Sequence, residues 1–303
     1  MSLTIVGTIA FDSIKTPFGK ADKVIGGAAT YTAWAASYLY DQIQLVSIIG
    51  DDWPSSEIDK MKARGIDLSG VNVVENGRSF FWEGEYDQNL IDRTTLTTEL
   101  NVLEDFDPVL PEEYKNSRFL MLGNLTPQIQ LKVMEQMKNR PAFVAMDTMN
   151  FWIDIARDDL ESAIRQVDLL SINDEEARLL SGKYNLVEAA ESIMEYGIRY
   201  LIIKKGEHGA LLFGENKMFF APALPLSSII DPTGAGDSFA GGLMGYLASQ
   251  PTIDFKTMKK GLIYGAVMGS FCVEDFSLQR LQNLDVTVIQ NRVDDLIELS
   301  SIE

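Results

Sequence analysis

The amino-acid sequence predicts an α/β fold in three layers, a mainly parallel sheet covered by helices on both faces. Short, apolar, β-branched runs alternate with amphipathic helical patterns along most of the 303 residues, as expected of strand–helix–strand units. The composition, 46% hydrophobic and 23% charged residues, is that of a globular protein with a sizeable core. Ligands of such sheets bind beyond the carboxyl ends of the strands.

The expected elements follow one another in a regular order along the chain. Six apolar runs are predicted to be buried strands: residues 3–10, 43–49, 119–122, 143–146, 169–172 and 201–204. Five amphipathic segments lie between them and are predicted helices: residues 28–39, 55–63, 127–139, 158–165 and 186–196. After Asp237 the chain is predicted to be largely helical. A closing helix is expected at 287–300, where Thr287 and Gln290 are spaced as a capping box.

Two segments interrupt this alternation, residues 16–25 and 78–100. The first is turn-rich, and the second has alternating aromatic residues followed by a threonine-rich stretch without a helical period. Both are predicted to be strands of a small antiparallel sheet, inserted at about 12–25 and 78–100 into a single domain of residues 1–303. The pattern alone is equally consistent with a lid and with an extension of the sheet edge.

Charge and composition limit the classes of partner. Twenty-six basic against 44 acidic residues give a net charge of −18, which disfavours nucleic acid as a partner. The single cysteine, Cys272, excludes an intramolecular disulfide. The first residues lack the basic and apolar regions of a signal peptide, and the apolar stretch 261–273 is too short to span a membrane. We therefore expect a cytoplasmic protein with neither a membrane nor a nucleic acid as partner.

A glycine-rich turn, Asp-Pro-Thr-Gly-Ala-Gly-Asp at residues 231–237, leads into a helical pattern. Gly234 and Gly236 allow a tight turn and a close approach of the backbone to a ligand. The first amides of the helix have no intrahelical partners, and the helix dipole adds positive potential there. This arrangement suits a phosphoryl group, and the carboxylate of Asp237 beside it can accept a proton from an attacking hydroxyl. The turn therefore predicts phosphoryl transfer to a hydroxyl.

Other interpretations of this turn are weaker. A dinucleotide fingerprint fails because Phe239 stands where the third glycine is required, and the chain contains no Walker motif. An ordinary capped helix would place Asp237 near the dipole without a function. The two glycines of the turn and the pair Gly241-Gly242 in the helix disfavour that simple explanation, since glycine destabilises helices.

The turn and four further motifs resemble the ribokinase (PfkB) family of carbohydrate and nucleoside kinases over nearly the whole chain. The motifs are Asp-x-Thr-Gly-Ala-Gly-Asp at 231–237, Gly-x-x-x-x-Asp at 7–12, the glycine pair at 26–27, Asn-x-x-Glu at 173–176 and Lys-Lys-Gly-Glu-His-Gly-Ala at 204–210. The resemblance implies a Rossmann-like, ribokinase-like fold, with the small sheet as a β-lid that often dimerises in relatives. It also implies ATP and Mg²⁺ as cofactors.

Roles of single residues are implied by this resemblance, and for Asp237 they agree with the chemistry of the turn. Asp237 would be the general base, and an anion hole would be formed by the amides of Gly234, Ala235 and Gly236. Asn173 and Glu176 would hold the Mg²⁺–phosphate assembly, Glu176 through water. The nucleotide would also meet Lys204, Gly206 and Gly209, and acceptor hydroxyls would meet Asp12 and Gly27. Asp231 and Thr233 resemble positions at which some members bind a monovalent cation such as K⁺.

Three departures from the family pattern concern the acceptor. Tyr31 occupies a position at which the family often has an asparagine that binds sugar hydroxyls, so this substrate-binding position is altered. The segment 147–152 only loosely resembles an Asp-x-Asn-x-Arg motif, and its missing arginine argues against a carboxylate or phosphate on the acceptor. Aromatic residues of the lid segment could stack on a nucleobase or a sugar face, or form the lid core; they are Phe80, Phe81, Trp82 and Tyr86.

Simpler structural explanations remain open at several motifs. Asn173 and Glu176 could merely cap a helix, and alternation does not say whether Lys204 or Lys205 faces the ligand. His208 is expected to be a loop side chain. Together, the motifs predict a kinase that transfers the γ-phosphoryl group of ATP to a hydroxyl of a small sugar. The alternatives are a nucleoside kinase of the same family and a non-catalytic ligand-binding module that retains the fold.

Overall fold

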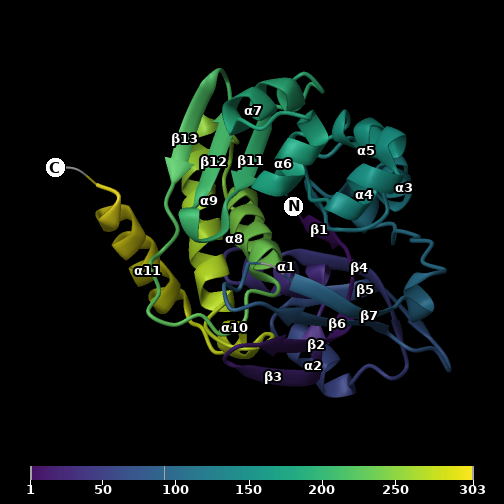
Figure 1. Ribbon diagram of the computed structural model, residues 1–303. Helices are drawn as coiled ribbons and strands as arrows, with labels where there is room; N and C mark the ends of the chain where they lie inside the picture. Colours follow the sequence, from purple (N-terminus) through teal and green to yellow (C-terminus); the bar gives the residue numbers. More distant parts are fainter. Residues whose placement is uncertain (1, 92, 302–303) are drawn as a thin grey trace.

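A large, mostly parallel sheet forms the centre of the molecule (Figure 1). The computed structural model describes residues 2–91 and 93–301. Within them the sheet has nine strands: β1 Leu3–Val6, β4 Ile43–Gly50, β5 Ile66–Val74, β8 Phe119–Leu122, β9 Phe143–Met146, β10 Leu169–Asn173, β11 Tyr200–Lys204, β12 Ala210–Gly214 and β13 Lys217–Ala221. Their order is β13-β12-β11-β10-β9-β8-β1-β4-β5, and only the β12–β13 hairpin at one edge is antiparallel to its neighbours. The predicted mainly parallel sheet is confirmed.

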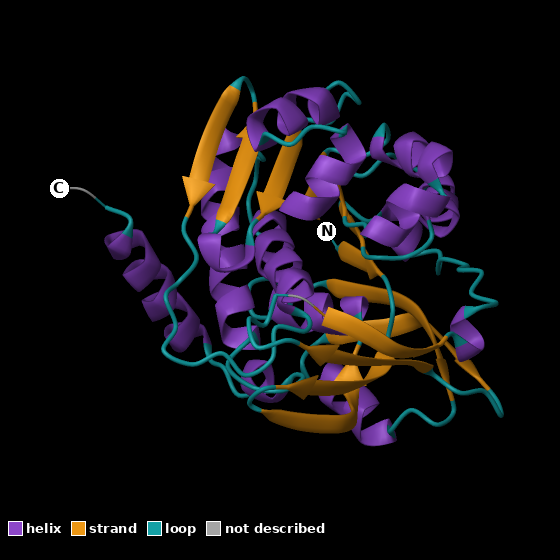
Figure 2. Ribbon diagram, viewed as in Figure 1, coloured by secondary structure: helices purple, strands orange, loops and turns teal. Residues whose placement is uncertain are grey.

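Helices cover both faces of this sheet (Figure 2). One apolar cluster packs against α1 Ala28–Ala36, α2 Ser55–Ala63, α8 Ala235–Ala248, α9 Phe255–Cys272, α10 Gln279–Gln282 and α11 Val286–Leu299. A second cluster lies on the other face, against α3 Pro127–Glu135, α4 Asn150–Ile155, α5 Arg157–Ile164, α6 Asp174–Ser181 and α7 Leu186–Met194. The three-layer prediction therefore holds. No helix of the described residues is both long and apolar enough to cross a membrane.

The small sheet is the second feature that the sequence predicts. Its order is β3-β2-β6-β7, formed by β2 Ala10–Thr16, β3 Gly19–Gly26, β6 Phe80–Tyr86 and β7 Arg93–Glu99. The central pair β2–β6 is parallel, not antiparallel as predicted, whereas the outer pairs are antiparallel. Between β2 and β6 the chain passes through the main sheet, so both strands enter the small sheet in the same direction. The predicted strand at 3–10 is likewise divided, because β1 ends at Val6 and Ala10 already belongs to the small sheet.

The glycines within α8 have a packing function. A Cβ atom at Gly241 would lie 2.3 Å from the carbonyl oxygen of Thr32, and one at Gly245 would lie 2.8 Å from that of Ala36. These glycines therefore allow α8 to approach α1 closely, and the α1 hydroxyl of Thr32 donates to the carbonyl of Asp237 at 3.1 Å. A Cβ atom at Gly242 would lie 2.6 Å from the carbonyl oxygen of Tyr264 in α9. The pair Gly241-Gly242 is therefore explained by the packing of α8 against two helices and is not a sign of a functional helix start.

Other local predictions differ from the structure. The closing helix is capped by Asp285, whose carboxylate accepts from the amides of Thr287 and Val288, so the predicted capping box at Thr287 and Gln290 is wrong. Strand β5 and the β12–β13 hairpin were not predicted from the sequence. β5 is an edge strand in which buried, half-buried and exposed residues are mixed, so it lacks the apolar run of the central strands.

Candidate active site

The glycine-rich turn forms the start of α8, as its sequence indicates. Gly234 is the N-cap and has φ of 77°, a left-handed conformation that favours glycine. A Cβ atom there would lie 2.6 Å from ring carbons of Tyr31, which packs beneath the turn. Ala235 and Gly236 are the first two residues of the helix, and Asp237 lies in its first turn. The amide of Ala235 donates to the carbonyl of Pro232 at 3.2 Å. The helix start places this amide and that of Gly236 beside the carboxylate of Asp237.

Asp237 is held in an environment that suits a proton acceptor. Burial, reinforced by the charge of Asp147, raises the pKa of Asp237 from its ordinary value of 3.8 to about 6. The cations Lys204 and Arg93 act in the opposite direction and lower this pKa. A carboxyl group with a pKa near 6 is mostly ionised at neutral pH and yet takes up a proton readily. The site can therefore remove a proton from a hydroxyl.

Three polar side chains lie at the carboxyl ends of neighbouring parallel strands. Asp147 follows β9, Asn173 ends β10 and Lys204 ends β11, with Asn173 directly paired with Lys204 across the ladder. The ammonium nitrogen of Lys204 lies 3.4 Å from Oδ1 of Asp147. A Cβ atom at Gly236 would also be 3.4 Å from this nitrogen, so Lys204 reaches the start of α8. Of the two lysines, Lys204 is therefore the one that faces the site.

Asn173 and Glu176 form a reciprocal capping box at the start of α6. The amide of Glu176 donates to Oδ1 of Asn173 at 2.7 Å, and the amide of Asn173 donates to Oε2 of Glu176 at 2.7 Å. Burial and the charge of Asp147 raise the pKa of Glu176 to about 7, against the influence of Lys204. The capping bonds use Oε2 of Glu176 and leave its Oε1 outside the capping box, whereas Oδ1, the single side-chain oxygen of Asn173, already accepts one hydrogen bond. Carboxylate and amide oxygens are ligands that Mg²⁺ accepts, usually together with phosphate oxygens and water.

The loop after β11 brings two further predicted residues to this edge. Gly206 and Gly209 have φ of 54° and 81° and flank a single 3₁₀ turn, Gly206–His208. A Cβ atom at Gly209 would lie 2.1 Å from the carbonyl oxygen of Ala221, so the loop closes tightly against the end of β13. His208 is exposed, as expected of a loop side chain.

Asp12 approaches the same site from the small sheet. Its carboxylate accepts from the amide of Gly27, and it is only 5% exposed. Burial, with the charges of Asp231 and Asp237, raises the pKa of Asp12 to about 7. The predicted residues Asp12, Gly27 and Asp237 thus lie within electrostatic reach of one another, although they belong to segments more than 200 positions apart.

Tyr31 is buried and does not line an open pocket. Its side chain is 1% exposed and lies beneath Gly234. Its hydroxyl has no hydrogen-bond partner among the described residues. Burial raises the pKa of this hydroxyl well above its ordinary value, so the group remains neutral.

Asp231 and Thr233 shape the turn from within. Asp231 is fully buried, and its Oδ1 accepts from the amide of Thr233 at 2.9 Å. Its other oxygen, Oδ2, has no partner among the described residues, and burial raises the pKa of this carboxyl group. The hydroxyl of Thr233 donates to that of Tyr86 in the small sheet at 3.1 Å. A buried carboxylate oxygen without a partner is a fitting ligand for a cation.

Two residues near this site, Asp147 and Arg93, were not predicted as site residues from the sequence. Asp147 opens the segment that resembled the family only loosely, and that segment was the available signal. Arg93 lies at the start of β7, and its charge lowers the pKa values of Asp12, Glu176 and Asp237. No motif pointed to Arg93, because its position depends on the register of the small sheet.

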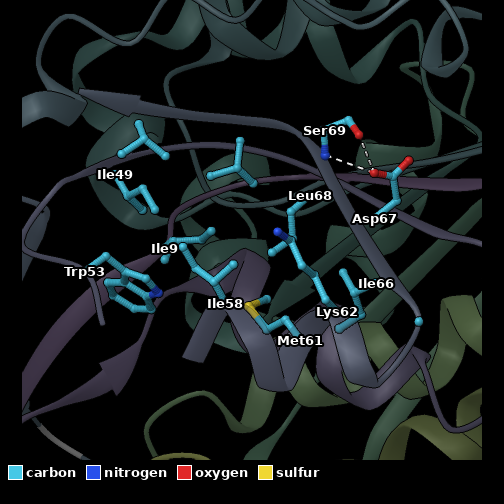
Figure 3. Close-up of a pocket in the computed structure, with 13 residues that line it drawn as sticks. Ile9, Ile49, Trp53, Ile58, Met61, Lys62, Ile66, Asp67, Leu68 and Ser69 are labelled. Carbon is cyan, nitrogen blue, oxygen red and sulfur yellow. Dashed lines mark hydrogen bonds between the residues drawn. The ribbon is translucent and has the colours of Figure 1, made fainter. Parts of the chain in front are cut away.

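A separate groove of about 460 Å³ lies between α2 and β5 (Figure 3). Aliphatic side chains such as Ile58, Met61 and Leu68 line most of it, together with Trp53. Its polar pair, Asp67 and Ser69, is satisfied internally, since the amide and the hydroxyl of Ser69 both donate to Oδ1 of Asp67. None of the predicted site residues lines this groove.

Similarity to known proteins agrees with this geometry. A family model described as pfkB family carbohydrate kinase matches residues 7–283. A cytidine kinase from Thermococcus kodakarensis is 28% identical over 256 residues, covering 83% of this chain and 90% of that protein. A nucleoside kinase from Methanothermobacter thermautotrophicus is 25% identical and covers 91% of both chains.

Solved structures show the same fold. A nucleoside kinase from Burkholderia thailandensis in complex with inosine has a TM-score of 0.80 at 21% identity, covering 98% of this chain and 99% of that one. A chain from E. coli that bears the name ribokinase II, in complex with ATP and Mg²⁺, has a TM-score of 0.80 at 19% identity, covering 97% and 99%. Since the family model spans most of its length, the chain belongs to the pfkB family of carbohydrate kinases and is an ATP-binding phosphotransferase with an alcohol acceptor.

Proposed function

We propose that this protein transfers the γ-phosphoryl group of ATP to a hydroxyl of a nucleoside. The observation that supports a nucleoside most directly is the pairing of Asp12 with Trp82 in the β2–β6 ladder. Paired residues of neighbouring strands project from the same face of a sheet. A carboxylate that can bind hydroxyls thus lies beside an indole that can stack on a base. The nucleoside and cytidine kinases among the relatives agree with this choice over the simple sugar that the sequence favoured.

The orientation of Trp82 supports this role. A Cβ atom at Gly84 would lie 2.2 Å from the indole, so the ring lies across the strand at the position that glycine leaves open. The indole nitrogen donates to the hydroxyl of Thr95 on β7 at 3.3 Å. The ring is half-buried, held in place and still partly accessible, which are the properties of a stacking platform.

In the proposed reaction the acceptor hydroxyl gives its proton to Asp237. Its oxygen forms a bond to the γ-phosphorus, while the bond from that phosphorus to the bridging oxygen breaks and ADP leaves with the electron pair. The oxygens of the group in transfer receive hydrogen bonds from the amides of Gly234, Ala235 and Gly236. Asn173 and Glu176 would hold Mg²⁺, which neutralises phosphate charge when bound, and Lys204 adds a fixed positive charge.

A monovalent cation such as K⁺ is part of the proposal. Asp231 is the candidate ligand, because its Oδ2 is buried without a partner among the described residues. A cation there would compensate the buried charge and fix the turn that bears Thr233. Activity should rise on adding KCl to a protein assayed in a tetramethylammonium buffer, and Asp231→Asn should remove the response. Equal activity with and without KCl in the tetramethylammonium buffer would argue against this site.

The acceptor class is tested with a panel of nucleosides and simple sugars, measured as ADP release. We expect turnover with at least one nucleoside. Trp82→Leu should raise KM for that nucleoside about tenfold or more, since stacking contributes about 1–3 kcal/mol per base. Trp82→Phe, which keeps an aromatic face, is the matched control and should change KM less. Turnover of a sugar but of no nucleoside would overturn the proposal, while the assignment to the kinase family would stand.

A further inference from the structure

Gln130 is a buried polar side chain at the carboxyl ends of two parallel strands. It lies on the buried face of α3, between Pro127 and Val133, and is only 1% exposed. Its Nε2 donates to the carbonyl oxygen of Gly123 at 2.9 Å and to that of Asp147 at 3.0 Å. Gly123 directly follows β8, and Asp147 directly follows β9. One amide group therefore connects the first residues beyond two neighbouring strands.

The two carbonyl groups lie where the ladder between these strands ends. Its last pair is Leu122 with Met146. The amide of Asp147 still donates to the carbonyl oxygen of Leu122 at 2.9 Å, but the carbonyl groups of Gly123 and Asp147 lie beyond that rung. Buried carbonyl groups cost free energy when they are left unpaired. Gln130 thus supplies the donor that the ladder no longer provides, and it holds both strand ends.

Chemistry determines which way round the amide of Gln130 lies. A flipped amide would set Oε1 against two carbonyl oxygens, which cannot donate a hydrogen bond. In the observed orientation Oε1 is buried and has no partner among the described residues. An unpaired buried oxygen is destabilising, so stability alone does not favour a glutamine at this position. Its placement is explained by what the Asp147 end of the link carries.

Asp147 transmits the position of the strand end to the site. Its amide and its carbonyl group are both hydrogen-bonded, to Leu122 and Gln130. Its carboxylate is fixed as well, since Oδ1 accepts from the amide of Thr148 at 3.0 Å and lies 3.4 Å from Nζ of Lys204. That ammonium nitrogen reaches the start of α8. A continuous series of contacts therefore leads from α3 through Asp147 to the lysine on the phosphate side.

We propose that Gln130 is a positioning residue, which holds the end of β9 so that Asp147 keeps the ammonium group of Lys204 at the start of α8. This inference rests on the proposed phosphoryl transfer, in which Lys204 supplies a fixed positive charge. An ammonium group on a flexible four-carbon stem needs an anchor to act at one point. The anchor is only as well placed as the backbone that carries it, and small displacements in an active site are costly.

The test measures by calorimetry the Kd of Mg·AMPPNP, a non-hydrolysable analogue of MgATP. Gln130→Met keeps the length of the side chain and removes both donors. We expect Kd to rise about fivefold, because a displaced Asp147 misplaces Lys204. Asp147→Asn, which removes the charge of the anchor, should have an effect of similar size. Gln128→Met is the matched control: Gln128 is exposed on the same helix and donates to Asp159, so Kd should not change.

The double variant separates positioning from a general loss of structure. If Gln130 acts through Asp147, adding Gln130→Met to Asp147→Asn should leave Kd about fivefold above that of the unaltered protein, whereas independent effects would multiply to about 25-fold. The multiplied value would overturn the proposal. So would a Kd of Gln130→Met within about twofold of the unaltered protein, or an equal loss in Gln128→Met. If melting shows that Gln130→Met is unfolded, Gln130→Asn, with the same amide on a shorter side chain, replaces it in the same comparison and with the same outcomes.

This experiment needs no acceptor and is therefore independent of the nucleoside assignment. If no nucleoside is turned over, that assignment fails while the comparison of Gln130 and Asp147 variants still decides the role of Gln130. If the unaltered protein does not bind Mg·AMPPNP, the proposed reaction and this inference are overturned together.

Discussion

Lys204 and Asp147 join the ends of two parallel strands, with Nζ of Lys204 lying 3.4 Å from Oδ1 of Asp147. Both side chains are largely buried, and the same Oδ1 accepts from the amide of Thr148 at 3.0 Å. Burial alone would lower the pKa of Lys204, but the charges of Asp147, Glu176 and Asp237 raise it instead. The lysine therefore stays protonated and is held beside the start of α8.

Replacing Asp147 should alter both charge and position in the site. In Asp147→Asn the pKa of Asp237 should fall, because the negative charge of Asp147 raises it. The acid limb of the kcat/KM profile should therefore move to lower pH. Lys204 loses its anchor, so KM for ATP should rise severalfold. Asp154→Asn, an exposed acid in α4, is the control and should leave the profile in place. A limb that moves to higher pH in Asp147→Asn would contradict this assignment.

The general base predicts the shape of the profile for the unaltered protein. Asp237 must be ionised to accept a proton, and its pKa is about 6. Because the pKa values of Asp12 and Glu176 are about 7, kcat/KM should be independent of pH only above about 7, and below about 6 it should fall at least tenfold per pH unit. Asp237→Asn should lower kcat by about 10³-fold or more, in keeping with the contribution of a general base and its charge, while calorimetry should show little change in Mg·ADP binding. Full activity of this variant would disprove the role of Asp237.

The sequence predicted those parts of the fold and site that local chemistry determines. The turn at 231–237 could be interpreted because its glycines and carboxylate lie within seven residues of each other. The strands β8, β9 and β10 are continuous apolar runs, since they are covered on both faces. The edge strand β5 lacks such a run and was missed.

Features that depend on pairing between distant segments could not be predicted. Asp12 and Trp82 are neighbours only because β2 and β6 pair in parallel, and Arg93 reaches the site only through the register of β7 against β6. Local alternation fits an antiparallel or a parallel pair equally well. The acceptor side of the site depends on such pairings, which is why the sequence described the phosphate side better.

Tyr31 provides a test of whether the buried tyrosine binds the acceptor. Its hydroxyl is buried and has no partner among the described residues, a situation that costs about 1–3 kcal/mol. Tyr31→Phe should therefore raise the melting temperature and leave KM for the acceptor unchanged. Gly234→Ala is a contrasting variant, because its Cβ atom would collide with the Tyr31 ring and should abolish activity. A tenfold rise of KM in Tyr31→Phe would instead place the hydroxyl in the acceptor site.

Asp12 links the acceptor site to the stability of the unliganded protein. Its folded-state pKa of about 7 exceeds the ordinary value of 3.8, so the folded protein binds the proton more tightly than the unfolded chain does. The stabilising contribution of the protonated group is fully present below about pH 4 and is lost as the pH rises through about 7. At pH 8 the buried carboxylate therefore opposes folding by an amount on the order of 4 kcal/mol.

Asp12→Asn should consequently raise the melting temperature by several degrees at pH 8 and by little at pH 5. If Asp12 binds the acceptor as proposed, the same variant should lose most of its activity, which is a usual trade between function and stability. Asp22→Asn on β3 is the control, because Asp22 is exposed and pairs with Lys20 at 3.0 Å. The difference in melting temperature between this variant and the unaltered protein should be the same at every pH. Calorimetric melts of the three proteins from pH 5 to 8 measure the effect. If Asp12→Asn were less stable than the unaltered protein at pH 8, the carboxylate would be a net stabilising group, and its role as a strained, acceptor-binding acid would be wrong.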